Sequence, residues 1–174
     1  MNGYLLDTNT LSYWVNARSP YHAAVESVID DLPEKTPLVV SAVTLGEIEY
    51  GLHASGKIST AHHPEFEQFV AKWFRVVLSV TKSTASYYGP LRARLFERFG
   101  GADNKTEARR PEQLADPATG EKLGVDENDV WIAAQAIEHT LVLVTHDRLH
   151  RIRSVTKDEL NLMVEDWARP PESL

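Results

Sequence analysis

The sequence predicts an α/β fold in which helices flank a central, mostly parallel sheet. Short apolar segments rich in leucine and valine alternate with longer segments of helical periodicity along the chain. The apolar segments are also continuous, as expected of parallel strands that are buried on both faces. Ligands of such sheets bind beyond the carboxyl ends of the strands, so the residues that follow each strand are the first candidates for function.

The expected elements follow from the spacing of apolar residues and from the breakers between them. Five segments are predicted as strands: 3–6, 38–40, 76–80, 141–145 and 162–164. Six segments are predicted as helices: 10–16, 21–31, 44–52, 64–73, 81–99 and 129–139. Pro90 is expected to kink or split the fifth helix. Segment 100–127 is rich in glycine, proline and charge, and we expect a surface insertion there, with a short helix near 111–115.

The length of 174 residues predicts a single domain. The chain has no cysteine, which excludes a disulfide scaffold, thiolate zinc sites and cysteine nucleophiles. No apolar run approaches the roughly 20 residues that cross a bilayer, and the N-terminus lacks the pattern of a signal peptide. We therefore expect a cytoplasmic protein without membrane association. The net charge of 18 − 25 = −7 argues, taken alone, against a nucleic-acid partner.

Acidic residues stand where this fold would place a ligand. Asp7 directly follows the first predicted strand, and Asp147 follows a later one. Asp129 begins a helix, and its side chain is predicted on the apolar face of that helix with Ile132 and Ala136. A charge on that face is costly unless it is paired or binds a metal.

Each acid also has a structural explanation. Aspartate is common in turns after strands, which covers Asp7 and Asp147, and Asp129 can stabilise the positive end of its helix. Thr44 and Glu47 fit a capping box at the start of their helix. As a cluster, however, the four carboxylates would raise one another's pKa. A divalent cation that prefers oxygen ligands, Mg²⁺ or Mn²⁺, would resolve that conflict.

Four short motifs follow one another along the chain. They are Asp7-Thr8-Asn9, Ser41-Ala42-Val43-Thr44-Leu45-Gly46-Glu47-Ile48-Glu49-Tyr50-Gly51, Asn128-Asp129-Val130-Trp131-Ile132-Ala133-Ala134 and Leu143-Val144-Thr145-His146-Asp147. In this order they resemble the motifs of PIN-domain ribonucleases, and the overall pattern is most similar to the VapC-type toxins of type II toxin–antitoxin systems. The ending Val164-Glu165-Asp166-Trp167 also resembles the last strand of that family.

The resemblance implies a PIN-like three-layer fold over residues 1–174 with a mostly parallel five-stranded sheet. It also implies a Mg²⁺- or Mn²⁺-dependent ribonuclease whose partners are RNA, a cognate antitoxin and a second copy of the chain. Asp7 and Asp129 would be the core metal ligands, and Glu47 a proton carrier or outer-sphere ligand. The full set of catalytic and metal-binding residues that it implies is Asp7, Glu47, Asp129 and Asp147, with Asn9 and Thr145 in support.

Four arginines are candidate contacts to RNA phosphates. Arg94 and Arg98 share one face of a predicted helix, whereas Arg148 and Arg151 lie close to Asp147 in the sequence. A solvated surface position is the alternative for each of them. Assigning the four acids to a metal site leaves a charge of −7 + 4 = −3, which clustered arginines can offset locally.

Two features depart from the family's pattern. His150 stands three residues after the fourth acid, where an aromatic residue is usual. Segment 100–127 places Glu47 and Asp129 unusually far apart in the sequence, and Asp126 could enter the site. These departures leave the substrate and the subgroup open.

Three other functions also stay open. A PIN-type nuclease of RNA processing would share the site but have no antitoxin, and a non-cleaving PIN module that binds RNA or protein would not need all four acids. A metal-dependent phosphatase of the haloacid dehalogenase type would carry a second acid two residues after Asp7, where this chain has Asn9. An adjoining antitoxin gene and metal-dependent cleavage of RNA would distinguish these functions.

Overall fold

The computed structural model describes residues 3–54, 62–100, 110–147, 150–156 and 160–169. Within these ranges no helix is long and apolar enough to cross a membrane.

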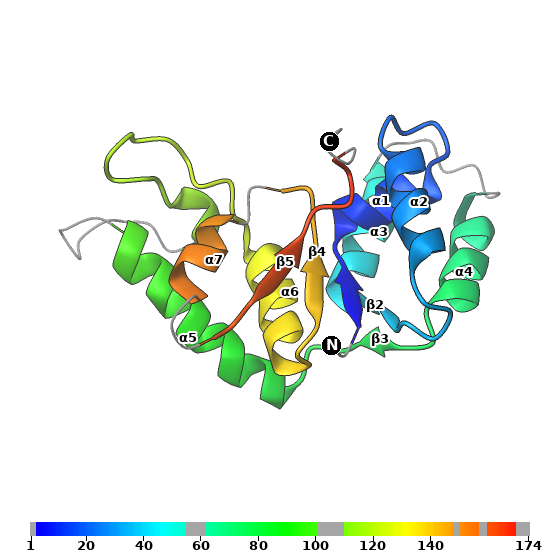
Figure 1. Ribbon diagram of the computed structural model, residues 1–174. Helices are drawn as coiled ribbons and strands as arrows, with labels where there is room; N and C mark the ends of the chain where they lie inside the picture. The colour runs from blue at the N-terminus through cyan, green and yellow to red at the C-terminus, as the bar shows by residue number, and fades with distance from the viewer. Residues whose placement is uncertain (1–2, 55–61, 101–109, 148–149, 157–159, 170–174) are drawn as a thin grey trace.

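The core of the fold is a parallel five-stranded sheet (Figure 1). Its strands are β1 (Tyr4–Leu6), β2 (Leu38–Ser41), β3 (Val77–Leu78), β4 (Val142–Val144) and β5 (Met163–Glu165). The strand order is β3-β2-β1-β4-β5, so the first strand of the chain lies at the centre. The predicted α/β fold class is thereby confirmed, with every strand pair parallel.

Helices connect the strands and cover the sheet (Figure 1). In the described ranges they are α1 (Thr8–Val15), α2 (His22–Asp31), α3 (Ala42–Ala54), α4 (His62–Trp73), α5 (Lys82–Phe99), α6 (Glu127–Glu138) and α7 (His150–Thr156), with one 3₁₀ turn, η1 (Pro111–Gln113). The turn η1 confirms the short helix expected near 111–115. Helix α7 was not predicted, because a seven-residue helix offers too few apolar residues for a periodic pattern.

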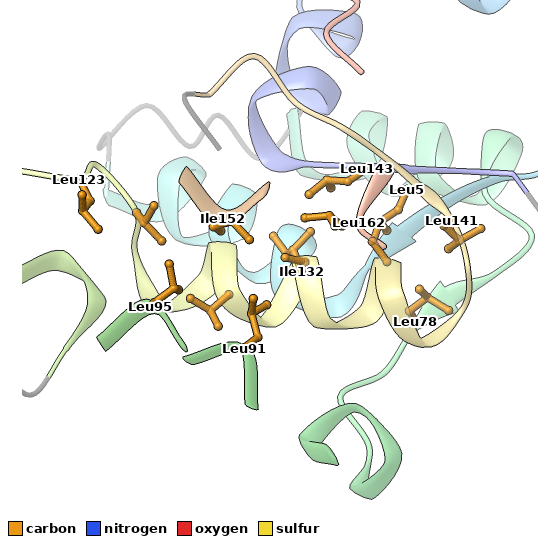
Figure 2. Close-up of a cluster of buried hydrophobic side chains, with 14 of the residues drawn as sticks. Leu5, Leu78, Leu91, Leu95, Leu123, Ile132, Leu141, Leu143, Ile152 and Leu162 are labelled. Carbon is orange, nitrogen blue, oxygen red and sulfur yellow. The ribbon is translucent and has the colours of Figure 1, made fainter. Parts of the chain in front are cut away.

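The two faces of the sheet have separate cores. Successive side chains of a strand point to opposite faces, so Leu5 and Leu143 enter one core while Leu6 and Val144 enter the other. Figure 2 shows the first core, which α5, α6 and α7 close with Leu91, Leu95, Ile132 and Ile152. The second core is closed by α1, α2 and α4 with Leu11, Trp14, Val25, Ile29 and Phe66. Burial on both faces explains why the strands are continuously apolar.

Helix α3 begins earlier than the sequence predicts. It starts at Ala42, directly after β2, and the Ser41 hydroxyl accepts a hydrogen bond from the Val43 N–H at 3.0 Å. Thr44 is therefore inside the helix and fully buried, not at its cap. The capping-box explanation for Glu47 is wrong, because the strand end already supplies the first hydroxyl acceptor.

Helix α5 is a single helix with Pro90 inside it, so the proline does not split it into two elements. Proline has no N–H to donate to the carbonyl of Ser86. Both Ser86 and Pro90 are exposed, so water can take the place of that lost bond.

Segment 110–126 departs from the expected surface loop. Leu114, Leu123 and Val125 are each 1% exposed and belong to the first core. An antiparallel bridge between Ala115 and Lys122 closes the segment on itself and brings two of these apolar residues together. Three widely spaced apolar residues give no period, which is why the sequence pattern missed their burial. Residues 101–109 lie outside the described part of the chain.

We predict that segment 110–126 contributes to the stability of the whole domain. Val125→Ala should lower the free energy of unfolding by about 2 kcal/mol, because it removes two buried methyl groups and leaves a cavity. Val80→Ala is the matched control, since that side chain is 44% exposed and should cost less than about 0.5 kcal/mol. Urea unfolding of both variants measures the difference. Equal losses would mean that the segment is dispensable.

Candidate active site

The site lies at the carboxyl edge of the sheet, where β1 and β4 end side by side. Asp7 follows β1 and is also the N-cap of α1, and its Oδ1 accepts a hydrogen bond from the Thr10 N–H at 2.7 Å. Its own N–H donates to the Val144 carbonyl of β4 at 3.0 Å. The side chain is only 5% exposed. One residue therefore ends a strand, begins a helix and carries a buried carboxyl group.

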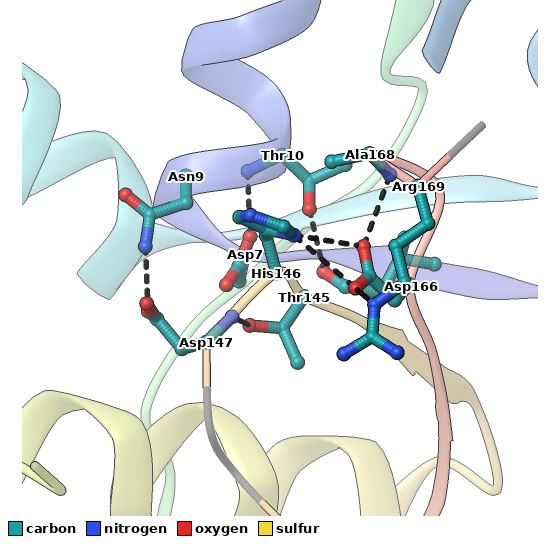
Figure 3. Close-up of polar contacts among 10 residues, drawn as sticks. Asp7, Asn9, Thr10, Thr145, His146, Asp147, Asp166, Ala168 and Arg169 are labelled. Atoms are coloured by element: carbon teal, nitrogen blue, oxygen red, sulfur yellow. Dashed lines mark hydrogen bonds and ion pairs between the residues drawn. The ribbon is translucent and has the colours of Figure 1, made fainter. Parts of the chain in front are cut away.

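Asp147 reaches the same edge from β4. Its N–H donates to the Thr145 hydroxyl at 3.0 Å, and its Oδ2 accepts a hydrogen bond from the Asn9 amide at 2.5 Å (Figure 3). The Thr145 side chain also hydrogen-bonds Asp7. The two residues predicted as supporting, Asn9 and Thr145, thus lie beside two of the predicted acids.

Asp129 enters the site from the start of α6. Asp126 is the N-cap, and its Oδ1 accepts a hydrogen bond from the Asp129 N–H at 2.9 Å. In return the Asp129 Oδ2 accepts from the Asp126 N–H at 2.8 Å. Asp129 therefore stabilises the helix start, and the same side chain lies close enough to Asp7 and Asp147 for their charges to act on it. Asp129 thus both stabilises the start of its helix, as the structural explanation holds, and lies within the acidic group, as the functional explanation requires.

Burial governs the electrostatics of these carboxyl groups. It raises the pKa of Asp7 from 3.8 to about 6, although hydrogen bonds from Thr145 and Thr10 lower it, and the charge of Asp147 adds a small further rise. Burial likewise raises the pKa of Asp129 to about 8, with further rises from Asp126, Asp147 and Asp7. No basic side chain contributes to either shift, so the described residues supply no positive charge to this pair.

Glu47 stands on α3 at the border of the acidic group. Its Oε1 accepts a hydrogen bond from the Asn128 amide at 2.8 Å, and its Oε2 accepts from the Thr8 hydroxyl. Thr8 and Asn128 are the immediate neighbours of Asp7 and Asp129 in the sequence. The structure thus brings all four predicted acids to one edge, and it adds Thr8 and Asn128 as residues that orient Glu47.

The donor set fits a hard divalent cation, since it consists of carboxylate, amide and hydroxyl oxygens without sulfur. Among the described residues, however, no three acidic or histidine side chains converge closely enough to enclose a metal ion on their own. Mg²⁺ is commonly bound in proteins by one or two carboxylates and several waters, so a close cluster of three is not a requirement for it. Asp7 is buried and Asp129 half-buried, and both have a raised pKa, so these two carboxylates would gain most from a bound cation.

Sequence reasoning missed a second polar group that begins at His146. The His146 Nδ1 lies 3.1 Å from the Asp166 Oδ1, and Asp166 is held in turn by the Arg169 Nε at 2.8 Å (Figure 3). Two tyrosines, Tyr13 and Tyr21, pack against the imidazole. His146 and Asp166 both lie within the sequence motifs, but nothing in the spacing of those motifs indicates that the two side chains meet.

Of the four predicted arginines, the structure gives a contact for Arg98. Its Nη1 donates to the Ser154 carbonyl at 2.9 Å and so joins α5 to α7. The role of the arginines in binding RNA stays a prediction. Arg148 lies outside the described residues, and so does the side chain of Arg151.

The sequence profile of the PIN domain matches residues 4–155. The chain belongs to the PIN-domain family. Its match spans β1 to α7 and includes all four acids. No curated protein matches the chain.

Solved structures share this PIN fold at low sequence identity. VapBC2 from Rickettsia felis, bound to a DNA fragment from its promoter, has 22% identity and a TM-score of 0.67, covering 94% of this chain and 98% of that one. FitAcB from Neisseria gonorrhoeae has 20% identity and a TM-score of 0.68, covering 96% and 99%. VapBC-5 from Mycobacterium tuberculosis, a member of the VapBC family of toxin–antitoxin systems, has 21% identity and a TM-score of 0.53, covering 95% and 98%.

We predict that the metal-free PIN domain loses stability as the pH rises. Asp129 has a folded-state pKa of about 8 against an ordinary value of 3.8. Between these values the folded protein retains a proton that the unfolded chain has lost, so the free energy of unfolding falls with rising pH. Asp129→Asn should remove most of the fall and, near pH 8, raise the free energy of unfolding by more than about 1.4 kcal/mol. Urea midpoints across this pH range measure both effects.

Metal provides the control for this prediction. Asparagine retains an oxygen that can accept the Asp126 N–H, so the variant preserves the capping box. Mg²⁺ or Mn²⁺ should restore the stability of the wild-type protein at high pH, because a bound cation stabilises only the folded state. It should restore little in Asp129→Asn. A wild-type protein whose stability rises with pH in the absence of metal would contradict the electrostatic account.

Proposed function

We propose that this PIN domain is a Mg²⁺- or Mn²⁺-dependent endoribonuclease and the toxin component of a toxin–antitoxin pair. The observation that carries the proposal is the electrostatically coupled pair of the buried Asp7 and the half-buried Asp129, whose pKa shifts include no contribution from a described basic side chain. Burying two carboxylates this way destabilises the fold unless a cation compensates them. A metal-dependent nuclease site would explain why the chain has these carboxylates although they lower the stability of the metal-free fold.

Each acid has a distinct part in the proposed reaction. Asp7 and Asp129 would hold the cation, and Asp147, fixed by Asn9 and Thr145, would extend the negative edge. A divalent cation in such a site lowers the pKa of a bound water and stabilises the charge that develops on the phosphate. Glu47 is held at a defined position from two sides and would carry a proton or bind the cation through water.

The toxin assignment rests on the likeness to solved structures. VapBC-5 is described as a member of a family of toxin–antitoxin systems, and it matches nearly the full length of this chain. By that likeness we propose an antitoxin partner that reaches the acidic edge with a basic side chain, which would substitute for the cation electrostatically. A homodimer is proposed on the same basis.

RNA cleavage is the direct test of the nuclease proposal. The wild-type protein should cleave RNA with Mn²⁺ or Mg²⁺ and stop when a chelator is added. Asp129→Asn should reduce the rate by roughly 10³-fold or more, a loss of the size seen when one transition-state charge stabiliser is removed. Cleavage should be followed with a labelled RNA on denaturing gels.

The control for cleavage is Glu49→Gln, which removes an acid on α3 that lies two residues from Glu47 and takes no part in the proposed site. It should cleave at the wild-type rate. Cleavage that persists in Asp129→Asn, or that ignores chelation, would refute the mechanism.

The partner proposal has its own test. The gene that adjoins this one should encode a small protein that copurifies with the chain and suppresses both its RNA cleavage and its toxicity on expression. Asp129→Asn should be non-toxic and should still bind that protein if other contacts supply most of the affinity. Cleavage of RNA without toxicity, and without an inhibitory neighbour, would instead favour a PIN nuclease of RNA processing.

A further inference from the structure

Three aromatic rings form a cluster beside the acids that the proposed reaction does not use. Tyr13 comes from α1, Tyr21 precedes α2, and His146 follows β4. The ring centroids of Tyr13 and Tyr21 are 4.7 Å apart, and those of Tyr21 and His146 are 4.8 Å apart. Tyr13 and His146 meet edge to face at 5.9 Å. These three residues are called the aromatic platform below.

Hydrogen bonds to Asp166 hold the imidazole of the platform in place. The His146 Nδ1 contacts both carboxylate oxygens of Asp166 at 3.1 and 3.2 Å. Asp166 is anchored by the Ala168 N–H at 3.0 Å and the Arg169 Nε at 2.8 Å (Figure 3). The segment after β5 therefore sets the orientation of a ring that follows β4.

The loop between α1 and α2 is held at the backbone of the two tyrosines. The Tyr21 N–H donates to the Ser19 hydroxyl at 3.2 Å, and the His22 Nδ1 lies 3.3 Å from the Tyr13 carbonyl. The rings themselves are restrained by their contacts with one another. Rings that are held in advance lose little conformational entropy when a ligand binds.

The platform adjoins the proposed cleavage site. His146 directly precedes Asp147, whose carboxylate belongs to the acidic group. Burial raises the pKa of the Tyr13 hydroxyl, and the charges of Asp147 and Asp7 raise it further. The hydroxyl is therefore within electrostatic reach of the acids.

The rings are partly open to solvent, unlike the aromatic residues of the cores. The His146 side chain is 29% exposed, and both tyrosines are half-buried. Trp14, which also contacts several rings, is by contrast almost fully buried. Arg169 is 79% exposed beside the platform and offers a positive charge next to an otherwise acidic edge.

We propose that the aromatic platform of Tyr13, Tyr21 and His146 stacks an unpaired base of the RNA substrate next to the scissile phosphate, with Arg169 placed for a neighbouring phosphate. The inference rests on the proposed ribonuclease function for its ligand. Stacking on aromatic side chains is tolerant of sequence because every base has a flat face. It also supplies affinity that does not depend on net positive charge, and this chain has a net charge of −7.

Binding of a short single-stranded RNA tests the platform. The measurements use fluorescence anisotropy with the full chain in an Asp129→Asn background, so that the RNA stays intact. Tyr21→Leu retains apolar bulk but loses the aromatic face, and it should weaken binding roughly 5- to 100-fold. Tyr21→Phe retains the ring and should bind within about twofold of its parent. The salt dependence of binding should be the same in all variants, because stacking releases no counterions.

Tyr87→Leu is the matched control. Tyr87 is a half-buried tyrosine on α5, a helix that carries none of the three platform rings and none of the four acids. Melting temperatures of both leucine variants check that each is folded.

A second ligand separates stacking from a structural effect. On a ribose-phosphate oligomer without bases, Tyr21→Leu should bind as tightly as its parent. An equal loss on both ligands, or no loss relative to Tyr87→Leu on RNA, would overturn the platform. If wild-type protein cleaves RNA while Tyr21→Leu retains full affinity, the platform fails and the nuclease proposal stands. If binding depends on the bases and on Tyr21 but the wild-type protein does not cleave RNA, the platform stands and the nuclease proposal fails.

Discussion

The crowding of buried carboxylates at the carboxyl edge of the sheet is the constraint on which this structure depends. Parallel strands end at one edge, so acids that follow β1 and β4 must meet there, and α6 adds a third. Burial is the main cause of the raised pKa of Asp7 and Asp129, the neighbouring acids raise it further, and hydrogen bonds from backbone and hydroxyl donors do not cancel the rise. The free energy of unfolding of the metal-free protein therefore falls as the pH rises from 3.8 to about 8.

The local structure around the site serves two purposes at once. Asp7 caps α1 and Asp129 completes the capping box of α6, so each carboxylate also satisfies a backbone donor of a helix start. Helix starts carry partial positive charge, which favours a nearby carboxylate. Burial nevertheless outweighs this effect, because both pKa values are raised. The helix starts position the acids, but they do not supply enough positive charge to compensate them. A bound cation would supply that charge.

The acids could be predicted from sequence because their placement follows from local rules. A strand end and a helix start are visible in the spacing of apolar residues, and the order of four motifs links them. Other features depend on tertiary contacts that no spacing reveals. The start of α3 was missed because β2 runs directly into it, and the burial of Leu123 and Val125 depends on a bridge between distant loop residues. The pairing of His146 with Asp166 joins segments that follow two different strands.

The central position of β1 has a consequence for how the protein is made. Leu5 pairs with Val39 of β2 on one side and with Leu143 of β4 on the other. The pairing of β1 is therefore complete only when β4 has been made. During synthesis, Asp7 is made first, but Asp129 and Asp147 can join it only after the segment up to residue 147 has been made. A nascent or truncated chain without that segment would lack the assembled acidic edge. Any activity that needs all four acids would thus be absent from such a chain.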